Sequence, residues 1–259
     1  MRADLYLVEH GYAASRTLAQ KLISEGVVTV DGRPLKKPSE DVPDGAHEVL
    51  VADTATTRYV GRGGLKLEAA LAAFPVDVRG ATVADIGAST GGFTDCLLQN
   101  GAARIFAVDS GHGQLHPRLA SDARVRSMEG VNARYLSPAD LARTESERTR
   151  EMSETFDGRV GGCVMDVSFI SQTLLHPTVA SLLLPEGWFI SLIKPQFELT
   201  GSALGKGGVV KSEKQRRAAV DRVLASAAAC GLRLCGVIES PIEGGDGNHE
   251  YLAYFIKQE

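Results

Sequence analysis

Cysteine is scarce in this sequence, and it is not spaced for a metal centre. Four of the 259 residues are cysteines. A structural zinc site typically needs cysteines paired in a C-x-x-C spacing. The four stand singly in apolar or helical stretches, so we expect buried free thiols and a reducing compartment, with no metal ligated. They are Cys96, Cys163, Cys230 and Cys235.

Long apolar runs are missing as well. The longest, residues 179–193, is interrupted by Pro-Glu-Gly at 185–187 and is too short to cross a bilayer. Residues 1–11 carry Arg2 and Glu9 where a signal peptide would need an apolar core. These absences exclude a membrane-spanning protein and favour a cytoplasmic one.

The sequence also lacks an excess of basic residues. The net charge of −4 gives no bulk attraction for nucleic acid, so any RNA contact must come from a local basic patch. With 44% hydrophobic and 23% charged residues, the composition is that of a soluble globular protein with a sizeable core. The length fits one domain of ordinary size plus a small appendage.

Residues 1–53 have the pattern of a small α+β unit. A short helix ended by Gly11 is followed by a second helix that Ser15 caps. Asp31-Gly32 is a strong hairpin signal, and a further short strand is expected at the end of the unit. The polar, Thr-rich residues 54–62 are expected to form a linker.

This unit resembles the small RNA-binding domain named after ribosomal protein S4. The resemblance rests on Ser15-Arg16 opening a helix and on the stretch Gly-Val-Val-Thr-Val-Asp-Gly at 26–32. It implies that basic side chains converge on RNA phosphates; the alternative is a merely solvated basic face. The candidate RNA-binding residues are Arg2, Arg16, Lys21, Arg33, Lys36, Lys37 and Arg62.

From residue 63 onward, short apolar strands alternate with helical segments, which predicts an α/β domain over 63–259. Such alternation is typical of a mostly parallel sheet covered on both faces. After a helix at 213–230, two more strands joined by a Gly-rich loop predict a terminal hairpin with an antiparallel strand at the sheet edge. The expected strands are 82–86, 105–108, 125–128, 162–167, 188–193, 232–239 and 250–256.

Two polar segments interrupt this pattern. Residues 142–155 are nearly all polar, and we expect a solvated helix or loop insertion without chemistry. Residues 201–210 could form a lid, an RNA-contacting loop or a plain connector.

A glycine-rich turn follows the first strand of this domain and opens a helix. Its sequence, Asp-Ile-Gly-Ala-Ser-Thr-Gly-Gly-Phe at 85–93, stands where a doubly wound sheet binds its nucleotide. It matches neither the G-x-G-x-x-G of dinucleotide enzymes nor a phosphate-binding P-loop. A glycine turn without a ligand remains an alternative.

The D-x-G-x-x-x-G-G spacing resembles the cofactor motif of S-adenosylmethionine-dependent methyltransferases. The resemblance places the methionine end of the cofactor at the turn and assigns the ribose to the acid ending the second strand. The adenine would meet residues after the third strand. In this order, the residues are Asp85, Gly87, Ser89 and Gly91, then Asp109, then Glu129 or Asn132.

Four charged residues in distinctive surroundings complete the candidate site: Lys66, Asp166, Lys194 and Glu250. Asp166 and Lys194 each follow an apolar strand, at the sheet edge where substrates bind. Taken together, the four are similar to the Lys-Asp-Lys-Glu tetrad of FtsJ-type RNA 2′-O-methyltransferases. With the N-terminal unit, the whole chain resembles the TlyA family, described both as ribosomal RNA cytidine 2′-O-methyltransferases and as haemolysins.

This resemblance implies methylation of a ribose hydroxyl in ribosomal RNA or in ribosomal subunits. We expect Lys194 to act as the base, with a pKa lowered by burial and by Lys66, while Asp166 orients it. Glu250 would hold Lys66 or the ribose. The alternatives are a membrane-active haemolysin, a silent RNA-binding protein, or a methyltransferase acting on small molecules or proteins. The sequence leaves the oligomeric state open.

Overall fold

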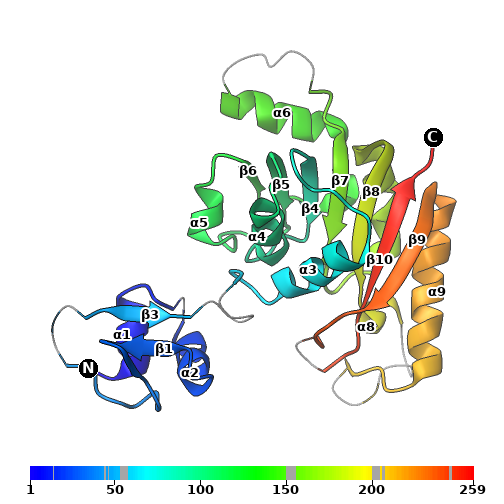
Figure 1. Ribbon diagram of the computed structural model, residues 1–259. Helices are drawn as coiled ribbons and strands as arrows, with labels where there is room; N and C mark the ends of the chain where they lie inside the picture. Colours follow the sequence, from blue (N-terminus) through cyan, green and yellow to red (C-terminus); the bar gives the residue numbers. More distant parts are fainter. Residues whose placement is uncertain are drawn as a thin grey trace. The chain divides into compact units, whose positions relative to one another are not determined.

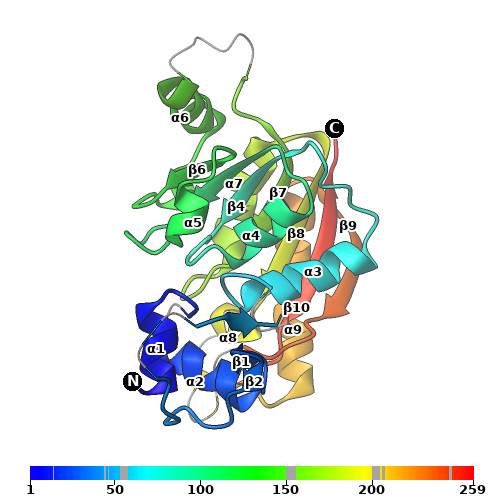
Figure 2. The same ribbon diagram turned by 60° about the vertical axis from the view of Figure 1, so that its left-hand side comes forward.

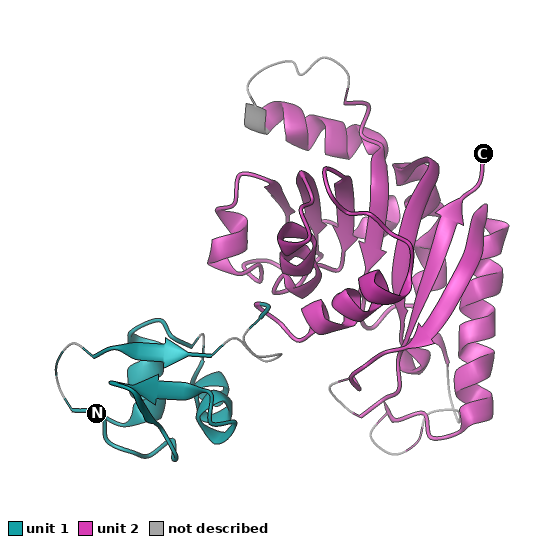
Figure 3. Cartoon of the chain, viewed as in Figure 1, with its two compact units in different colours: residues 1–59 teal, residues 60–259 magenta. Residues whose placement is uncertain are grey.

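The chain divides into two compact units, which are coloured separately in Figure 3. The computed structural model describes residues 1–13, 15–43, 45, 47–52, 58–149, 156–199, 205, 208–244 and 247–259. Unit 1 spans Met1–Tyr59 and unit 2 spans Val60–Glu259. Of the linker expected at 54–62, residues 54–57 lie outside the described residues, and the division falls among the rest.

Unit 1 packs two helices against a three-stranded antiparallel sheet of order β2-β1-β3. Asp31 and Gly32 both have positive φ angles, 50° and 75°, which suits a tight hairpin between β1 and β2. The Ser15 hydroxyl accepts a hydrogen bond from the Leu18 amide and so caps α2. The elements are α1 (Ala3–Glu9), α2 (Arg16–Ser24), β1 (Val28–Val30), β2 (Arg33–Pro34) and β3 (Val49–Val51).

Unit 2 is built on a seven-stranded sheet of order β6-β5-β4-β7-β8-β10-β9. The first five strands in this order run parallel, and β10 is antiparallel to both of its neighbours. This confirms the predicted α/β class with an antiparallel edge. The strands are β4 (Thr82–Ile86), β5 (Arg104–Val108), β6 (Val125–Met128), β7 (Val160–Met165), β8 (Leu183–Ile193), β9 (Leu232–Glu239) and β10 (Tyr251–Lys257).

Helices cover both faces of this sheet (Figures 1 and 2). In Figure 2, α3 and α4 lie in front of the strands, whereas α7 lies behind them. A large core forms where strand residues such as Phe106 and Phe189 pack with α7 and α9. The helices are α3 (Gly63–Ala73), α4 (Gly92–Gln99), α5 (Pro117–Ala120), α6 (Pro138–Thr149), α7 (His176–Leu182), α8 (Pro195–Glu198) and α9 (Glu213–Ala229), with 3₁₀ turns at Ala133–Tyr135 and Gln172–Leu174.

The register of four adjacent strands aligns their ends at one edge of the sheet. Ile86 on β4 pairs with Met165 on β7, and Ile193 on β8 pairs with Tyr251 on β10. The parallel strands end here, and β10 starts here because it runs the other way. The residues next to these positions on β4, β7, β8 and β10 are Gly87, Asp166, Lys194 and Glu250.

The solvated helix or loop expected at 142–155 is a helix in its described part, but one of its side chains is not solvated. Helix α6 turns one polar side chain inward: Glu145 is 2% exposed and lies 2.7 Å from Arg126 of β6. A buried carboxylate needs such a partner, and this ion pair anchors α6 to the sheet. Residues 150–155 lie outside the described residues.

The prediction of buried thiols is confirmed for Cys96 and Cys163. It is wrong for Cys235, which is exposed on the edge strand β9, and Cys230 is half-buried. All four are free thiols. Cys235 lies at the register shift of β9 against β10, between Gly236, which pairs with Tyr254, and Leu234, which pairs with Phe255.

A buried histidine makes the stability of unit 2 depend on pH. His176 is fully buried, its Nδ1 lies 2.9 Å from the Ser226 hydroxyl, and burial lowers its pKa to about 4. Between pH 6.5 and 4 the unfolded chain therefore binds a proton that the folded chain does not. Stability should fall by up to about 3 kcal/mol as the pH drops through this range.

The variant His176→Asn keeps a polar atom near Ser226 but cannot take up the proton. Urea titrations from pH 7.5 to pH 4 should show a shallower loss of stability in this variant than in the natural protein. Parallel profiles for the two proteins would contradict the assignment.

Candidate active site

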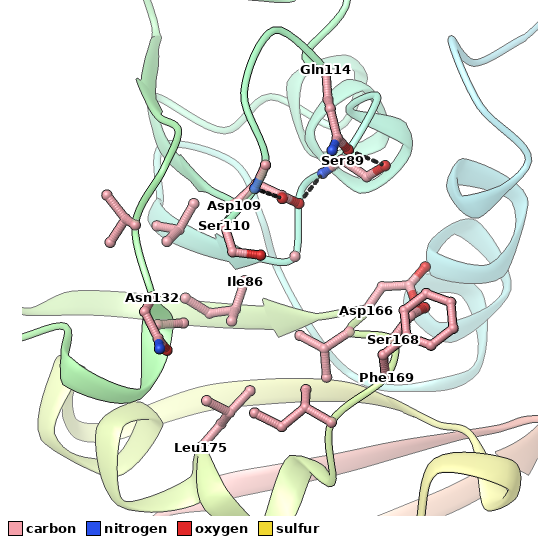
Figure 4. Close-up of a pocket in the computed structure, with 17 residues that line it drawn as sticks. Ile86, Ser89, Asp109, Ser110, Gln114, Asn132, Asp166, Ser168, Phe169 and Leu175 are labelled. Atoms are coloured by element: carbon pink, nitrogen blue, oxygen red, sulfur yellow. Dashed lines mark hydrogen bonds between the residues drawn. The ribbon is translucent and has the colours of Figure 1, made fainter.

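A pocket of about 450 Å³ opens at the aligned strand ends (Figure 4). We call it the larger pocket. Its walls come from the turns after β4, β5, β6 and β7, and Asn132 lies at one end while Asp166 and Phe169 lie at the other. Predicted site residues in its lining are Gly87, Ser89, Asp109, Asn132 and Asp166.

The glycine-rich turn has a backbone that only glycine tolerates at two positions. Gly87 and Gly91 have φ angles of 83° and 98°. A Cβ atom on Gly87 would collide with the carbonyl oxygen of Asp166, and one on Gly91 would collide with Leu119. The glycines therefore bring the turn close to its neighbours, and Gly91 leads directly into α4.

Asp109 fastens this turn to the end of β5. One carboxylate oxygen accepts a hydrogen bond from the Ser89 amide at 2.8 Å, and the other accepts one from the Gly111 amide at 2.7 Å (Figure 4). The side chain thus faces the larger pocket at a fixed position.

Asp85 lies behind the turn. It lines neither the larger pocket nor the smaller pocket that adjoins it. Its side chain is fully buried, and Oδ2 accepts a hydrogen bond from the Thr94 hydroxyl at 2.6 Å. Oδ1 has no hydrogen-bond partner among the described residues. Burial, opposed by the Thr94 hydrogen bond, raises the pKa of Asp85 to about 7. A buried acceptor of this kind suits a cationic ligand group.

Asn132 and Glu129, the two candidates for the adenine end of the cofactor, lie in different places in the structure. Asn132 lines the larger pocket, with its side chain accepting a hydrogen bond from the Arg134 amide. Glu129 is absent from that lining and caps the loop after β5. Its carboxylate accepts hydrogen bonds from three successive amides, which lowers its pKa; they belong to Gly113, Gln114 and Leu115.

A second pocket of about 220 Å³, the smaller pocket, adjoins the first. Arg62 and Gly63, at the start of α3, form one wall, and Lys194 contributes to another. The two pockets share lining residues: Gly87, Ser89, Asp166 and Ser168. A molecule in the larger pocket and another in the smaller pocket would therefore meet beside Asp166.

The four charged residues form two ion pairs. Lys194 Nζ lies 2.5 Å from Asp166 Oδ1 and donates a hydrogen bond to the Ser168 hydroxyl at 2.9 Å. Lys66 and Glu250 form the second pair, which is buried: the side chains are 9% and 2% exposed. The structure thus brings Lys194 to Asp166 in the smaller pocket, and it keeps Lys66 and Glu250 outside the lining of both pockets.

Comparison with known proteins agrees with this geometry. The profile of FtsJ-like methyltransferases matches residues 59–257, and that of the S4 domain matches residues 1–47. The chain is 39% identical to the 16S/23S rRNA (cytidine-2′-O)-methyltransferase TlyA of Mycobacterium tuberculosis, over 99% of this chain and 90% of that protein.

The chain belongs to the TlyA group of the FtsJ-like methyltransferase family.

Two further relatives are similar over nearly their whole length. A Bacillus subtilis protein named as a candidate rRNA methyltransferase, YqxC, is 42% identical over 98% of this chain and 84% of its own. A solved Streptococcus thermophilus structure described as a candidate hemolysin is 39% identical, with a TM-score of 0.73. It covers 100% of this chain and 89% of its own.

As an FtsJ-like methyltransferase, the protein uses S-adenosylmethionine, and the residues at the larger pocket fit that cofactor. Asp85 lines neither pocket, but its Oδ1, which has no hydrogen-bond partner among the described residues, lies behind the glycine turn and would accept from the ammonium of the methionine part through a bridging water. Asp109 faces the same space with two oxygens suited to ribose hydroxyls, and Asn132 lies at the end left for the adenine.

Phe169 belongs to this methyltransferase site but gave no signal in the sequence beyond its place in Ser-Phe-Ile-Ser. Its side chain is 92% exposed and its φ is 65°, in the left-handed region that non-glycine residues rarely occupy. Its ring centroid lies 5.2 Å from that of Phe197, whose ring lies beneath Lys194 Nζ at 5.9 Å. An exposed aromatic ring beside the Lys194–Asp166 pair is suited to stacking on a base.

Two further residues hold the turn that carries Phe169. The Ser171 hydroxyl lies 2.5 Å from a carboxylate oxygen of Glu198, and the other oxygen accepts the Gln172 amide at 2.9 Å. Glu198 is 2% exposed. The Ser-Phe-Ile-Ser and Lys-Pro-Gln-Phe-Glu stretches are therefore tied to each other at their ends.

The seven basic residues proposed to contact RNA are all exposed. Arg2 and Arg16 share one buried partner, Asp4, and Lys21 lies 3.5 Å from Glu25. Arg62 lines the smaller pocket instead. Their exposure fits RNA binding and a merely solvated basic face equally well.

Two negative findings apply to the part of the chain that the structure describes. No helix there is long and apolar enough to cross a membrane. No three histidine, cysteine, aspartate or glutamate residues there are grouped so that they could hold a metal ion.

Proposed function

We propose that this protein transfers a methyl group to the 2′-hydroxyl of a cytidine ribose in ribosomal RNA. The observation that carries the proposal is the Lys194–Asp166 pair, which faces the smaller pocket where it meets the cofactor pocket. The S4 domain in unit 1 supports an RNA substrate, and the printed activity of the Mycobacterium tuberculosis relative supports cytidine in ribosomal RNA.

S-adenosylmethionine supplies an electrophilic methyl group when bound. The remaining requirements are to place the ribose hydroxyl in line with that methyl and to remove one proton. Lys194 is positioned to accept the proton at Nζ when its amine is neutral. Asp166 and Ser168 fix the direction of the amine and, after transfer, Asp166 pairs with the resulting ammonium.

The other charged residues have supporting roles in this proposal. Glu250 holds Lys66 in a buried pair next to the start of α3, which is one of the two roles that we expected for Glu250 from the sequence. Arg62, in the wall of the smaller pocket, is placed to bind the phosphate of the target nucleotide.

Phe169 provides a test of how the target nucleotide is held. If its exposed ring stacks on a base, Phe169→Ala should raise the KM for RNA by roughly 5- to 150-fold, since such stacking contributes about 1–3 kcal/mol. Phe169→Tyr keeps the aromatic face and should remain near the natural value. Equal KM values for the alanine variant and the natural protein would contradict this role.

The proposed function is tested by methyl incorporation. The protein is incubated with methyl-labelled S-adenosylmethionine and with small subunits, large subunits or the naked ribosomal RNAs. We expect label at a cytidine whose 2′-position resists alkaline cleavage. Label on a base, or on protein only, would overturn the proposal. Comparing subunits with naked RNA also shows which of the two is the partner of the enzyme. We propose that the enzyme is cytoplasmic.

A further inference from the structure

Unit 1 contains a buried carboxylate that binds three side chains at once. Asp4, on the first turn of α1, is 0% exposed. Arg2 reaches it with Nε and Nη2, each at 3.0 Å, and Arg16 reaches it with Nε at 2.8 Å. The Gln20 amide donates a further hydrogen bond at 2.8 Å. Asp4 thus links the start of α1 to one face of α2.

The two arginines are only half covered. Their side chains are 45% and 53% exposed, although the carboxylate between them is completely covered. Each guanidinium has five N–H donors in a rigid fork. Arg2 uses two nitrogens and Arg16 one nitrogen to contact Asp4. Among the described residues, the remaining donors of both forks have no hydrogen-bond partner, so they can bind another oxygen-rich group, and phosphate suits this geometry.

The charges also favour an anion at this place. Two guanidinium groups against one carboxylate leave a net charge of +1, and hydrogen bonds from Arg2, Gln20 and Arg16 hold the pKa of Asp4 far below its ordinary value. Asp4 therefore stays ionised over any working pH. The Asp4 amide donates to the Pro38 carbonyl, which places the loop bearing Lys36 and Lys37 beside the same turn of α1.

We propose that Asp4 is a positioning residue for RNA binding, which holds Arg2 and Arg16 as a paired fork for a backbone phosphodiester. This rests on the proposed function, because it takes RNA as the substrate. Asp4 itself does not contact the RNA. Its contribution is to fix two long side chains before binding, so that their conformational entropy is not lost when the phosphate binds.

The substitution Asp4→Asn separates two explanations, because they predict opposite changes in the Kd for RNA. It raises the charge of unit 1 by one, so long-range attraction alone would tighten RNA binding. Positioning predicts weaker binding, with a Kd for ribosomal RNA about tenfold higher. Glu9→Gln is the matched control, because it makes the same change of charge at an exposed position of α1. It should leave the Kd unchanged or slightly lower it.

Filter binding of the full-length protein to ribosomal RNA, over a range of salt concentrations, measures these effects. In the Asp4→Asn variant, the slope of log Kd against log salt concentration should fall by the equivalent of about one phosphate contact or more. Its affinity for S-adenosylmethionine and its kcat at saturating RNA should stay unchanged. An unchanged or lower Kd in a folded Asp4→Asn variant would overturn the proposal. A merely structural role for Asp4 would lower stability and all activities together.

A second variant keeps the test decisive if Asp4→Asn fails to fold. Arg16→Lys preserves the exposed charge but removes the fork, and it should weaken RNA binding nearly as much as Arg16→Ala. Natural affinity in Arg16→Lys would show that charge alone suffices and would overturn the proposal. Because RNA binding is measured apart from methyl incorporation, the positioning of the arginines can fail while the methyltransferase function holds, or the reverse.

Discussion

Replacing Lys194 with alanine is expected to lower kcat about 10²- to 10⁴-fold, the range typical of losing a general base. The amine lies 2.5 Å from Asp166 and within the wall of the smaller pocket, where the acceptor hydroxyl is proposed to bind. Lys194 is absent from the lining of the larger pocket. The Kd for S-adenosylmethionine, measured by calorimetry, should therefore change little.

Lys194→Arg is the matched control for this prediction. It keeps a positive charge beside Asp166, but a guanidinium does not give up its proton at any accessible pH. A base at this position predicts that arginine is nearly as inactive as alanine. If arginine restored most of the turnover, Lys194 would be stabilising charge rather than accepting a proton. Loss of cofactor affinity with kcat preserved would contradict the assignment outright.

The second large effect is expected for Asp85→Asn, which should raise the stability of the protein and weaken its binding of S-adenosylmethionine. Asp85→Asn retains an acceptor for the Thr94 hydroxyl but removes the buried charge. An asparagine cannot pair with the ammonium of the cofactor, and a lost charge-assisted hydrogen bond of about 1.5–3 kcal/mol corresponds to a Kd for S-adenosylmethionine roughly 10- to 150-fold higher.

The stability effect has a defined dependence on pH. The pKa of Asp85 is about 7 in the folded chain, raised from 3.8, mainly by burial. Between these values the folded chain holds a proton that the unfolded chain has lost, so stability falls as the pH rises and levels off above pH 7. The full loss is of the order of 4 kcal/mol.

Thermal unfolding without cofactor should separate the two proteins in this range. At pH 8, Asp85→Asn should melt above the natural protein, and at pH 4 the two melting temperatures should nearly coincide. If the variant melts below the natural protein at pH 8, a contact in the folded protein must stabilise the ionised carboxylate of Asp85. That result would contradict the prediction.

The sequence predicted most of what depends on local pattern. The strands 82–86 and 125–128 have the expected bounds, because short segments with apolar residues between turn residues define buried parallel strands well. The glycine turn was predictable for the same reason: Gly87 and Gly91 are needed by the backbone itself. Asp166 and Lys194 were found because each ends an apolar strand, and the register of the sheet brings such residues to one edge.

Long-range arrangements were less accessible. The sequence left open whether Glu250 holds Lys66 or the ribose, and only the structure shows that it pairs with Lys66, 184 residues away. A terminal hairpin was predicted, but not that its second strand would insert between β8 and β9. Glu129 follows a strand as a ligand-binding acid would, yet it does not line the larger pocket. Such outcomes depend on packing, which hydrophobic periodicity does not encode.

The most direct test of the account is a structure of the protein with S-adenosylmethionine bound. We predict that the methionine ammonium lies beside the glycine turn, linked to Asp85 Oδ1 through a bridging water, and that the sulfonium methyl points into the smaller pocket. Lys194 Nζ should then lie across the space of one hydroxyl group, about 3 Å from the oxygen that approaches the methyl. A methyl directed away from the smaller pocket, or separated from Lys194 by the glycine turn, would contradict the proposed chemistry.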